Sequence, residues 1–360
     1  MNTMPGRPPT MKDVAAAAGV ALKTVSRHVN GATNIDPVLA QRIADAIVSL
    51  GYRHNLAAAS IRPGRSAKVV GLVISDLANP YWSVLARAVE RVCSANGYLL
   101  VTVSSEEDGE RHRLLIDRLI AQRVDGLIVA PPRRDDGLWA AAAAAVVPVV
   151  AIDPPVARAV ESVGEAADAV NGSSLEQPNS TPSVETVLAD NAGGAENATR
   201  ALLKGGARRI LFLGDSVELY TMRERLAGYR RALLAWGDAV DAPDAALVDT
   251  SAHTAIEAAA IVTGLLGSDR IDAVFAANNR SSIGALEAFT HAGTRLPLVG
   301  FDDFEAAPLV RPAVSVVAQD VSLMGETAAR AVLARLDGSA AEESSTTVLP
   351  TALVLRGSER

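Results

Sequence analysis

The first thirty residues hold the feature that most constrains the fold: two short helical stretches separated by a glycine. Small and apolar residues recur at helical spacing from Thr10 to Ala18, and Gly19 allows a sharp turn. The second stretch, LKTVSRHVN, carries basic and polar side chains. This layout is typical of a helix-turn-helix, whose second helix enters the major groove of double-stranded DNA. Taken alone, the pattern also fits an ordinary three-helix bundle with solvated charges.

The second stretch supplies most of the candidate DNA contacts. Arginine and lysine suit guanine edges or phosphates, serine and threonine suit either, and leucine can touch a thymine methyl group. The candidate DNA-binding residues in this region are Thr10, Leu22, Lys23, Thr24, Ser26, Arg27 and Asn30.

The pattern also predicts how this small unit packs. Thr10 and Asp13 have the spacing of a capping box, and Asp36-Pro37 is a typical start for a third helix. The apolar residues expected to face inward are Val14, Ala17, Val20, Val25, Val29, Val38, Ile43, Ile47 and Leu50.

Charge is distributed unevenly along the chain. The 360 residues carry a formal net charge of −7, yet residues 1–65 hold eight Lys and Arg against three acids. A balance of +5 in this segment leaves −12 for the remainder, so a basic head would meet phosphates while an acidic body is repelled. Chance variation between short surface segments is the alternative. The single cysteine, Cys93, excludes an internal disulfide and is expected to be a buried apolar filler.

From Val69 onward, short apolar runs alternate with amphipathic stretches. This alternation predicts an α/β fold, with parallel sheets covered on both faces. The expected strands are Val69–Ile74, Tyr98–Val103, Gly126–Ala130, Val147–Ile152, Arg209–Gly214, Ala273–Ala277 and Pro297–Phe301. The expected helices include Trp82–Ala95, Arg111–Gln122, Ala192–Lys204, Arg223–Trp236 and Ile256–Leu266. Ligands of such sheets bind beyond the carboxyl ends of the strands, where Asp76 to Trp82, Asp153, Asp215, Asn278 and Asp302 lie.

Several of these segments together resemble the lactose-repressor/galactose-repressor family of bacterial transcription regulators. In the head they are Met11-Lys-Asp-Val-Ala, Ala18-Gly-Val, Thr24-Val-Ser-Arg27, Val29-Asn-Gly31, Leu50-Gly-Tyr52 and Asn55 to Arg62. In the body they are Asp76-Leu-Ala-Asn-Pro80, Gln122-Arg-Val-Asp-Gly126, Arg223 to Tyr229, Phe275-Ala-Ala-Asn278, Val299-Gly-Phe-Asp-Asp303 and Gln319-Asp320.

The resemblance implies three parts. They are a helix-turn-helix headpiece at 10–54, a hinge helix or linker at 55–66, and a two-lobed, periplasmic-binding-protein-like body at 67–360. One lobe would comprise about 68–153 and 320–348, and the other about 186–318 and 349–357. The chain would cross between lobes near 153–185, near Gln319, and before a final strand at Thr347–Val354. The resemblance further implies minor-groove contacts by Asn55, Ala58 and Ile61, with Ile61 wedged into a base step.

The resemblance also implies a ligand pocket in the cleft between the lobes. The matching positions are Asn79, Tyr81, Trp82, Asp153, Arg225, Asn278, Asp302 and Gln319. An arginine fork, carboxylates, amides and aromatic faces suit a sugar or a similar metabolite. Alternatively, Trp82 belongs to the core, Asp302 caps a helix or binds a solvated arginine, and Arg225 pairs with Glu224 on a helix surface.

Four departures from the family pattern concern the operator and the ligand. Ala21 stands where serine is usual, so the second helix loses its side-chain cap. Asn279 replaces the usual aspartate, and the connection Ala292–Leu298 is short. The segment 156–182, rich in Ala, Ser, Asn and Pro, is expected to be a flexible insertion.

These features predict a cytoplasmic, homodimeric repressor that binds a palindromic operator and is gated by a small metabolite, with no membrane partner, cofactor, metal or catalytic residue. One alternative is a regulator whose body binds a protein or no ligand. A more remote alternative is an esterase-like hydrolase, because Leu213-Gly-Asp-Ser216 resembles a nucleophile block. The later histidines His253 and His291 lack the expected sequence context for that chemistry.

Overall fold

The computed structural model describes residues 7–53, 66–131, 147–153, 184–236, 247–340 and 345–360. The chain divides into two compact units, Met1–Ala67 and Lys68–Arg360. The predicted hinge contacts Asn55, Ala58 and Ile61, and the predicted insertion at 156–182, lie outside the described residues.

The described residues of the first unit form three helices around a small apolar core. They are α1 (Met11–Ala18), α2 (Leu22–Val29) and α3 (Pro37–Leu50), and their core is centred on Val14, Val25 and Ile43. Gly19 ends α1 at φ +63°, where an added Cβ would lie 2.6 Å from a guanidinium nitrogen of Arg42. The turn between α1 and α2 therefore requires glycine for its backbone angle, whereas a Cβ would displace only the end of the flexible Arg42 side chain.

Three of the predicted inward-facing residues are instead exposed: Ala17, Val38 and Leu50. Helix α1 has only eight residues, and its narrow buried stripe consists of Val14, Ala15 and Ala18. Helix α3 buries Ile43 and Ala46 near its middle and leaves its two ends exposed. The predictions for the starts of α2 and α3 are confirmed. Asp36 caps α3 by accepting from the backbone N–H groups of Val38 and Leu39, and Ala21 provides no side-chain cap for α2.

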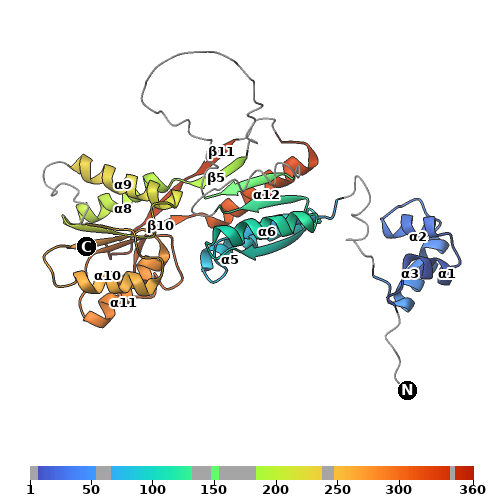
Figure 1. Ribbon diagram of the computed structural model, residues 1–360, viewed down its shortest axis with the longest axis horizontal. Helices are drawn as coiled ribbons and strands as arrows, with labels where there is room; N and C mark the ends of the chain where they lie inside the picture. Colours follow the sequence, from blue (N-terminus) through green and yellow to red (C-terminus); the bar gives the residue numbers. More distant parts are fainter. Residues whose placement is uncertain (1–6, 54–65, 132–146, 154–183, 237–246, 341–344) are drawn as a thin grey trace, which may run out of the picture. The chain divides into compact units, whose positions relative to one another are not determined.

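In the second unit, the part of the chain that the structure describes is built on two six-stranded sheets (Figure 1). The first has the order β11-β5-β4-β3-β1-β2 and the second the order β12-β10-β9-β8-β6-β7. The first sheet comprises β1 (Val69–Ile74), β2 (Leu99–Ser104), β3 (Gly126–Val129), β4 (Val149–Ile152), β5 (Glu185–Ala189) and β11 (Thr346–Leu349). The second comprises β6 (Ile210–Leu213), β7 (Val248–Asp249), β8 (Ala273–Ala276), β9 (Leu298–Phe301), β10 (Ser315–Gln319) and β12 (Thr351–Val354). All neighbouring strands are parallel except β10 and β12, which are antiparallel.

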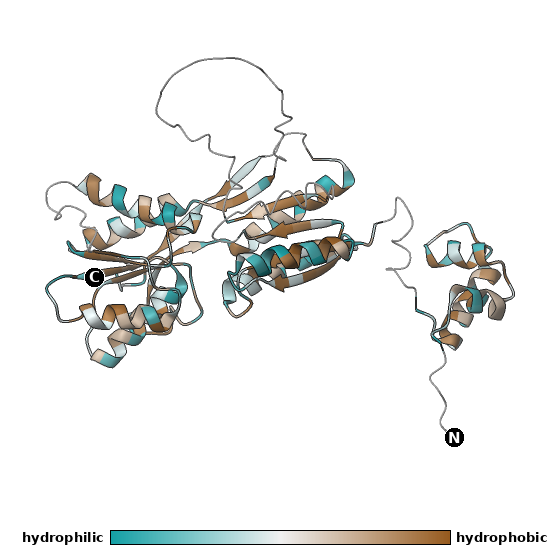
Figure 2. Ribbon diagram, in the orientation of Figure 1, coloured by the Kyte–Doolittle hydropathy of each residue, from teal (hydrophilic) through white to brown (hydrophobic). Residues whose placement is uncertain are grey.

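Helices pack on both faces of each sheet and define two lobes. The first lobe joins its sheet to α5 (Pro80–Ala95), α6 (Gly109–Ala121) and α12 (Val321–Asp337). The second lobe joins its sheet to α8 (Asn191–Lys204), α9 (Tyr220–Trp236), α10 (Ala255–Leu265) and α11 (Asn279–Ala292). Strands in both lobes are largely apolar, whereas the helices mix apolar and polar residues (Figure 2). This division follows because the central strands are buried on both faces and the helices on one. Cys93 is fully buried in the first lobe, as predicted.

The structure corrects two boundaries between the lobes. Strand β5 pairs with β4 and β11 in the first sheet, so residues 186–189 do not belong to the second lobe and the chain crosses at Asp190. The single predicted strand Thr347–Val354 is divided at Pro350 between the two sheets. Proline has no backbone N–H to continue a ladder, which suits it to the point where the chain leaves one sheet for the other. The crossing predicted near Gln319 lies between β10 and α12.

Candidate functional site

The predicted DNA-binding residues of α2 divide into exposed and half-buried groups. Leu22, Lys23, Arg27 and Asn30 are exposed, and Thr24 and Ser26 are half-buried. Val25 on the opposite face is fully buried against the other two helices. Helix α2 therefore presents a polar face to solvent while its apolar side anchors it, which is what a helix inserted into a groove requires.

Four of the predicted DNA-binding side chains have partners within the headpiece. The Asn30 side-chain N–H donates to the backbone oxygen of Ser26 and, at 3.3 Å, to the Ser26 hydroxyl. The Arg27 guanidinium donates to the backbone oxygen of Asn34 at 3.1 Å and to the Asn34 side-chain oxygen. Thr10 donates from both its backbone N–H and its hydroxyl to the Asp13 carboxylate, each at 2.8 Å, and these bonds lower the pKa of Asp13. The bonds of Thr10 thus stabilise the start of α1, and those of Arg27 stabilise the loop that follows α2.

Several of the predicted ligand-binding residues lie around one buried arginine in the second unit. Arg225 donates from Nε to Asn191 Oδ1 at 2.8 Å and from Nη1 to the backbone oxygen of Ala277 at 2.7 Å. Its Nη1 also lies 3.3 Å from Asp302 Oδ2. The guanidinium carbon lies 3.7 Å from the centroid of the Phe301 ring. The alternative of a surface pair with Glu224 is wrong, because only 3% of Arg225 is exposed.

Close helix packing brings Arg225 to these partners. Arg225 lies on α9 and Asn191 begins α8, and a Cβ at Gly228 would lie 2.0 Å from the backbone oxygen of Ala192. Only glycine permits this approach of α9 to α8. The glycine three residues after Arg225 therefore helps to set the position of its guanidinium.

Two aspartates follow strands of opposite lobes, and both interact with the charge of this arginine. Asp153 follows β4 and Asp302 follows β9, and both adopt positive φ, at 76° and 70°. The Tyr81 hydroxyl donates to Asp153 Oδ2 at 3.4 Å, and the Gln319 amide donates to Asp302 Oδ1. Non-glycine residues rarely adopt such φ values, and they persist where the surroundings fix them, often at binding sites.

The cleft also contains buried oxygen atoms that accept no hydrogen bond from the described residues. They are Asp153 Oδ1 and Gln319 Oε1. Burial raises the pKa of Asp153 to about 6, Arg225 opposes this shift, and Asp302 adds to it. Buried acceptors normally have donors, so a ligand that carries hydroxyl or N–H groups would complete this set.

The remaining predicted pocket residues serve mainly local structure. Trp82 lies in the apolar core of the first lobe and packs edge-to-face on Tyr81, with ring centroids 4.9 Å apart. Asn79 caps α5 by accepting from the backbone of Tyr81, and Asn278 caps α11 by accepting from that of Ser281. The amide N–H groups of these two asparagines are not used by the caps.

The raised pKa of Asp153 predicts a pH-dependent stability. From its ordinary value of 3.8 up to about 6, the folded protein holds a proton at Asp153 that the unfolded chain releases. The free energy of unfolding should therefore fall as pH rises through this window, by roughly 2–3 kcal/mol from this group. Asp153→Asn should remove that part of the slope in urea unfolding at pH 4.5 and 7. The exposed Asp117→Asn should keep it, and an equal slope in both variants would contradict the assignment.

Comparison with known proteins agrees with this architecture. Residues 10–55 match the description "Bacterial regulatory proteins, lacI family", and residues 199–359 match "Periplasmic binding protein-like domain". The chain is 33% identical to the HTH-type transcriptional regulator CelR of Thermobifida fusca, with 98% of each chain covered. The chain belongs to the LacI family. It is accordingly a DNA-binding transcriptional regulator and not an enzyme.

Solved LacI-family structures share the fold. A transcriptional regulator CelR-cellobiose complex superposes with a TM-score of 0.68 at 32% identity, covering 97% of this chain and 99% of the other. A lac repressor dimer bound to operator and the anti-inducer ONPF superposes with a TM-score of 0.80 at 25% identity, covering 98% and 99%. The predicted fold class, a helix-turn-helix headpiece with a periplasmic-binding-protein-like body, is confirmed.

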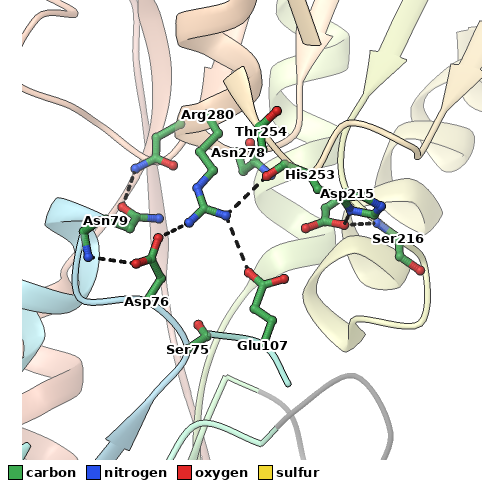
Figure 3. A network of polar contacts seen from close by, with 12 residues as sticks. Ser75, Asp76, Asn79, Glu107, Asp215, Ser216, His253, Thr254, Asn278 and Arg280 are labelled. Atoms are coloured by element: carbon green, nitrogen blue, oxygen red, sulfur yellow. Dashed lines mark hydrogen bonds and ion pairs between the residues drawn. The ribbon is translucent and has the colours of Figure 1, made fainter. Parts of the chain in front are cut away.

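The block that suggested an esterase has a different arrangement from a catalytic triad. The Nδ1 atom of His253 does contact the Asp215 carboxylate. The Ser216 hydroxyl, however, accepts from the backbone N–H of Glu218 at 3.2 Å and points away from the His253 ring (Figure 3). The Ser216 hydroxyl is therefore not aligned on the pair formed by Asp215 and His253.

Several residues that shape the cleft were not predicted from the sequence. Asn191 follows β5, which is not among the strands predicted from the sequence. Its position beside Arg225 could therefore not be predicted either. Arg280, Glu107 and His253 lie in a polar network at the cleft (Figure 3). Arg280 could have been predicted as a candidate, since it follows Asn278 and Asn279 just after the carboxyl end of a predicted strand.

Proposed function

We propose that this LacI-family regulator binds a palindromic operator as a homodimeric repressor, and that a neutral sugar or sugar-like metabolite in the cleft changes its operator affinity. Two-fold symmetry of a dimer would match two half-sites of inverted sequence. An effector that prefers one state of the body would shift operator affinity by its differential binding. Since its target is chromosomal DNA, we place the protein in the bacterial cytoplasm.

The observation that carries the effector proposal is the set of unsatisfied acceptors around Arg225. Asp153 Oδ1 and Gln319 Oε1 are buried acceptors, and hydroxyl groups of a sugar are matching donors. Two carboxylates face one guanidinium here, so the site disfavours an added negative charge such as a phosphate or an acid. Similarity to a regulator solved with cellobiose supports a saccharide.

Calorimetry with the full-length protein tests this proposal. Cellobiose is the first titrant, followed by monosaccharides, a phosphosugar and a nucleoside. We expect one neutral saccharide to bind with a micromolar Kd and to change the affinity for a duplex selected from a random pool. Absence of binding across the panel would favour a body that binds a protein or no ligand.

Neighbouring aspartates offer a matched control for this experiment. Asp302→Asn should weaken the saccharide at least tenfold, because its carboxylate faces Arg225 and Gln319. Asp303→Asn should leave binding unchanged, because Asp303 instead bonds Arg356, at 2.6 and 2.8 Å. Equal effects of the two substitutions would count against the cleft as the binding site.

A further inference from the structure

A second set of polar side chains joins the two lobes, outside the group around Arg225. Arg280, near the start of α11 in the second lobe, contacts the carboxylate of Asp76 in the loop after β1 (Figure 3). Its Nη1 atom lies 3.5 Å from Glu107 Oε1, in the loop after β2. Beside it, Asn279 donates from Nδ2 to Asn79 Oδ1 at 2.9 Å. One short segment of the second lobe thus reaches two separate loops of the first.

Each side of this contact is held in place by its own lobe. In the second lobe, Arg280 also donates to the backbone oxygen of His253 at 3.3 Å. In the first lobe, Asp76 Oδ1 accepts from the backbone N–H of Ala78 at 2.8 Å. These bonds orient the charged groups before they meet, which lowers the entropic cost of the pairing between lobes.

The loop that carries Glu107 has an unusual backbone. Glu106 and Glu107 both adopt the left-handed region, with φ of 54° and 61°, although neither is a glycine. Adjacent residues of this kind are rare, and such strain is typical of segments that surrounding contacts hold at functional sites. The outcome here is that the Glu107 carboxylate faces the other lobe.

Asn279 also contributes to the contact between the lobes. An aspartate there would place a negative charge next to Arg280 on its own helix and opposite the Asn79 oxygen. Asn279 instead supplies an N–H donor to that oxygen, and it is buried. Since Asn279 carries no charge, it does not compete with the carboxylates of Asp76 and Glu107 for the Arg280 guanidinium.

We propose that Asp76, Asn79, Glu107, Asn279 and Arg280 form an interlobe clasp that holds the cleft closed in the absence of a ligand. The covalent connections between the lobes, at Asp190, near Asp320 and at Pro350, act as the hinge about which the clasp opens. The clasp sets the resting equilibrium between open and closed forms, which is the quantity that an effector must shift. Only this last consequence rests on the proposed function.

Distances between two nitroxide labels in the free protein, measured by double electron–electron resonance, test the clasp directly. Nitroxide labels at Arg87→Cys on α5 and Arg230→Cys on α9 place one exposed label on each lobe. Native Cys93 is buried and stays unlabelled. Excess unlabelled chain leaves at most one labelled protomer in each oligomer. We expect one dominant distance in the parent protein. In Arg280→Gln, the ratio of this population to a longer-distance population should fall by about fivefold.

Several comparisons separate a clasp from a general loss of structure. Asp76→Asn, on the opposite lobe, should shift the distances in the same direction, and the double variant should go little further than either single one. One molar NaCl should produce a similar shift in the parent protein, because salt screens the pair. Arg335→Gln removes an ion pair that is somewhat more shielded, to Glu185 within the first lobe, and should leave the distances unchanged.

An unchanged distance distribution in folded Arg280→Gln and Asp76→Asn would overturn the proposal, as would an equal shift in Arg335→Gln. Circular dichroism establishes that each variant is folded. If Arg280→Gln does not fold, Asp76→Asn alone decides the outcome. No DNA and no sugar is present in these measurements, so their result is independent of whether the proposed effector is correct.

Discussion

Arg27→Ala is expected to lower the affinity of the full-length protein for its selected operator duplex by about two orders of magnitude. Arg27 is exposed on α2, and a bidentate contact between an arginine and a guanine contributes about 1–3 kcal/mol. Its side chain also bonds the backbone and side-chain oxygens of Asn34. Alanine would therefore remove a base contact and release the loop after α2 at the same time.

Fluorescence anisotropy at several salt concentrations separates the possible causes. Loss of a base contact leaves the slope of log K against log salt unchanged, whereas loss of a phosphate contact lowers it by about one. Asn34→Ala should release the loop and keep the base contact, so it should cost less than Arg27→Ala. Arg91→Ala is the control, because Arg91 pairs with Glu326 in the body. Full affinity of Arg27→Ala for the selected duplex would refute the assignment of α2 as the reading helix.

The regular parts of the fold were accessible from the sequence because their patterns are local. Buried parallel strands are continuous apolar runs, and Val69–Ile74 was predicted with the bounds that β1 has. Helix starts were accessible for the same reason, since Asp36-Pro37 needs only two neighbouring residues to identify it.

Other features depend on contacts between distant residues, and local patterns cannot show them. Strand β5 has only five residues, and its place in the first sheet is decided by pairing with β4 and β11. Trp82 looked equally suited to core and pocket, and only packing against the first sheet assigns it to the core. Local patterns also cannot show the contacts of Arg280 with Asp76 and Glu107, because Asp76 is 204 positions away in the sequence.

Arg225→Met is expected to destabilise the body by about 3–5 kcal/mol and to abolish effector binding. Methionine approximates the length of the side chain and can keep contact with Phe301. It leaves Asp302 Oδ2, Asn191 Oδ1 and the Ala277 backbone oxygen without the donor that Arg225 supplies, although Gln319 still donates to Asp302 Oδ1. Removing one partner of a buried ion pair costs this much because the other charge stays buried. Urea unfolding at pH 7 gives the loss in free energy.

The double variant Arg225→Met/Asp302→Asn distinguishes the lost pair from a loss of packing. If the cost arises from an uncompensated carboxylate, neutralising Asp302 should recover part of the stability that Arg225→Met removes, whereas a packing defect would persist. Effector binding should return in neither case, because a hydroxyl acceptor and the guanidinium fork are both absent. Recovery of saccharide affinity in the double variant would show that Arg225 holds the fold of the cleft without contacting the ligand.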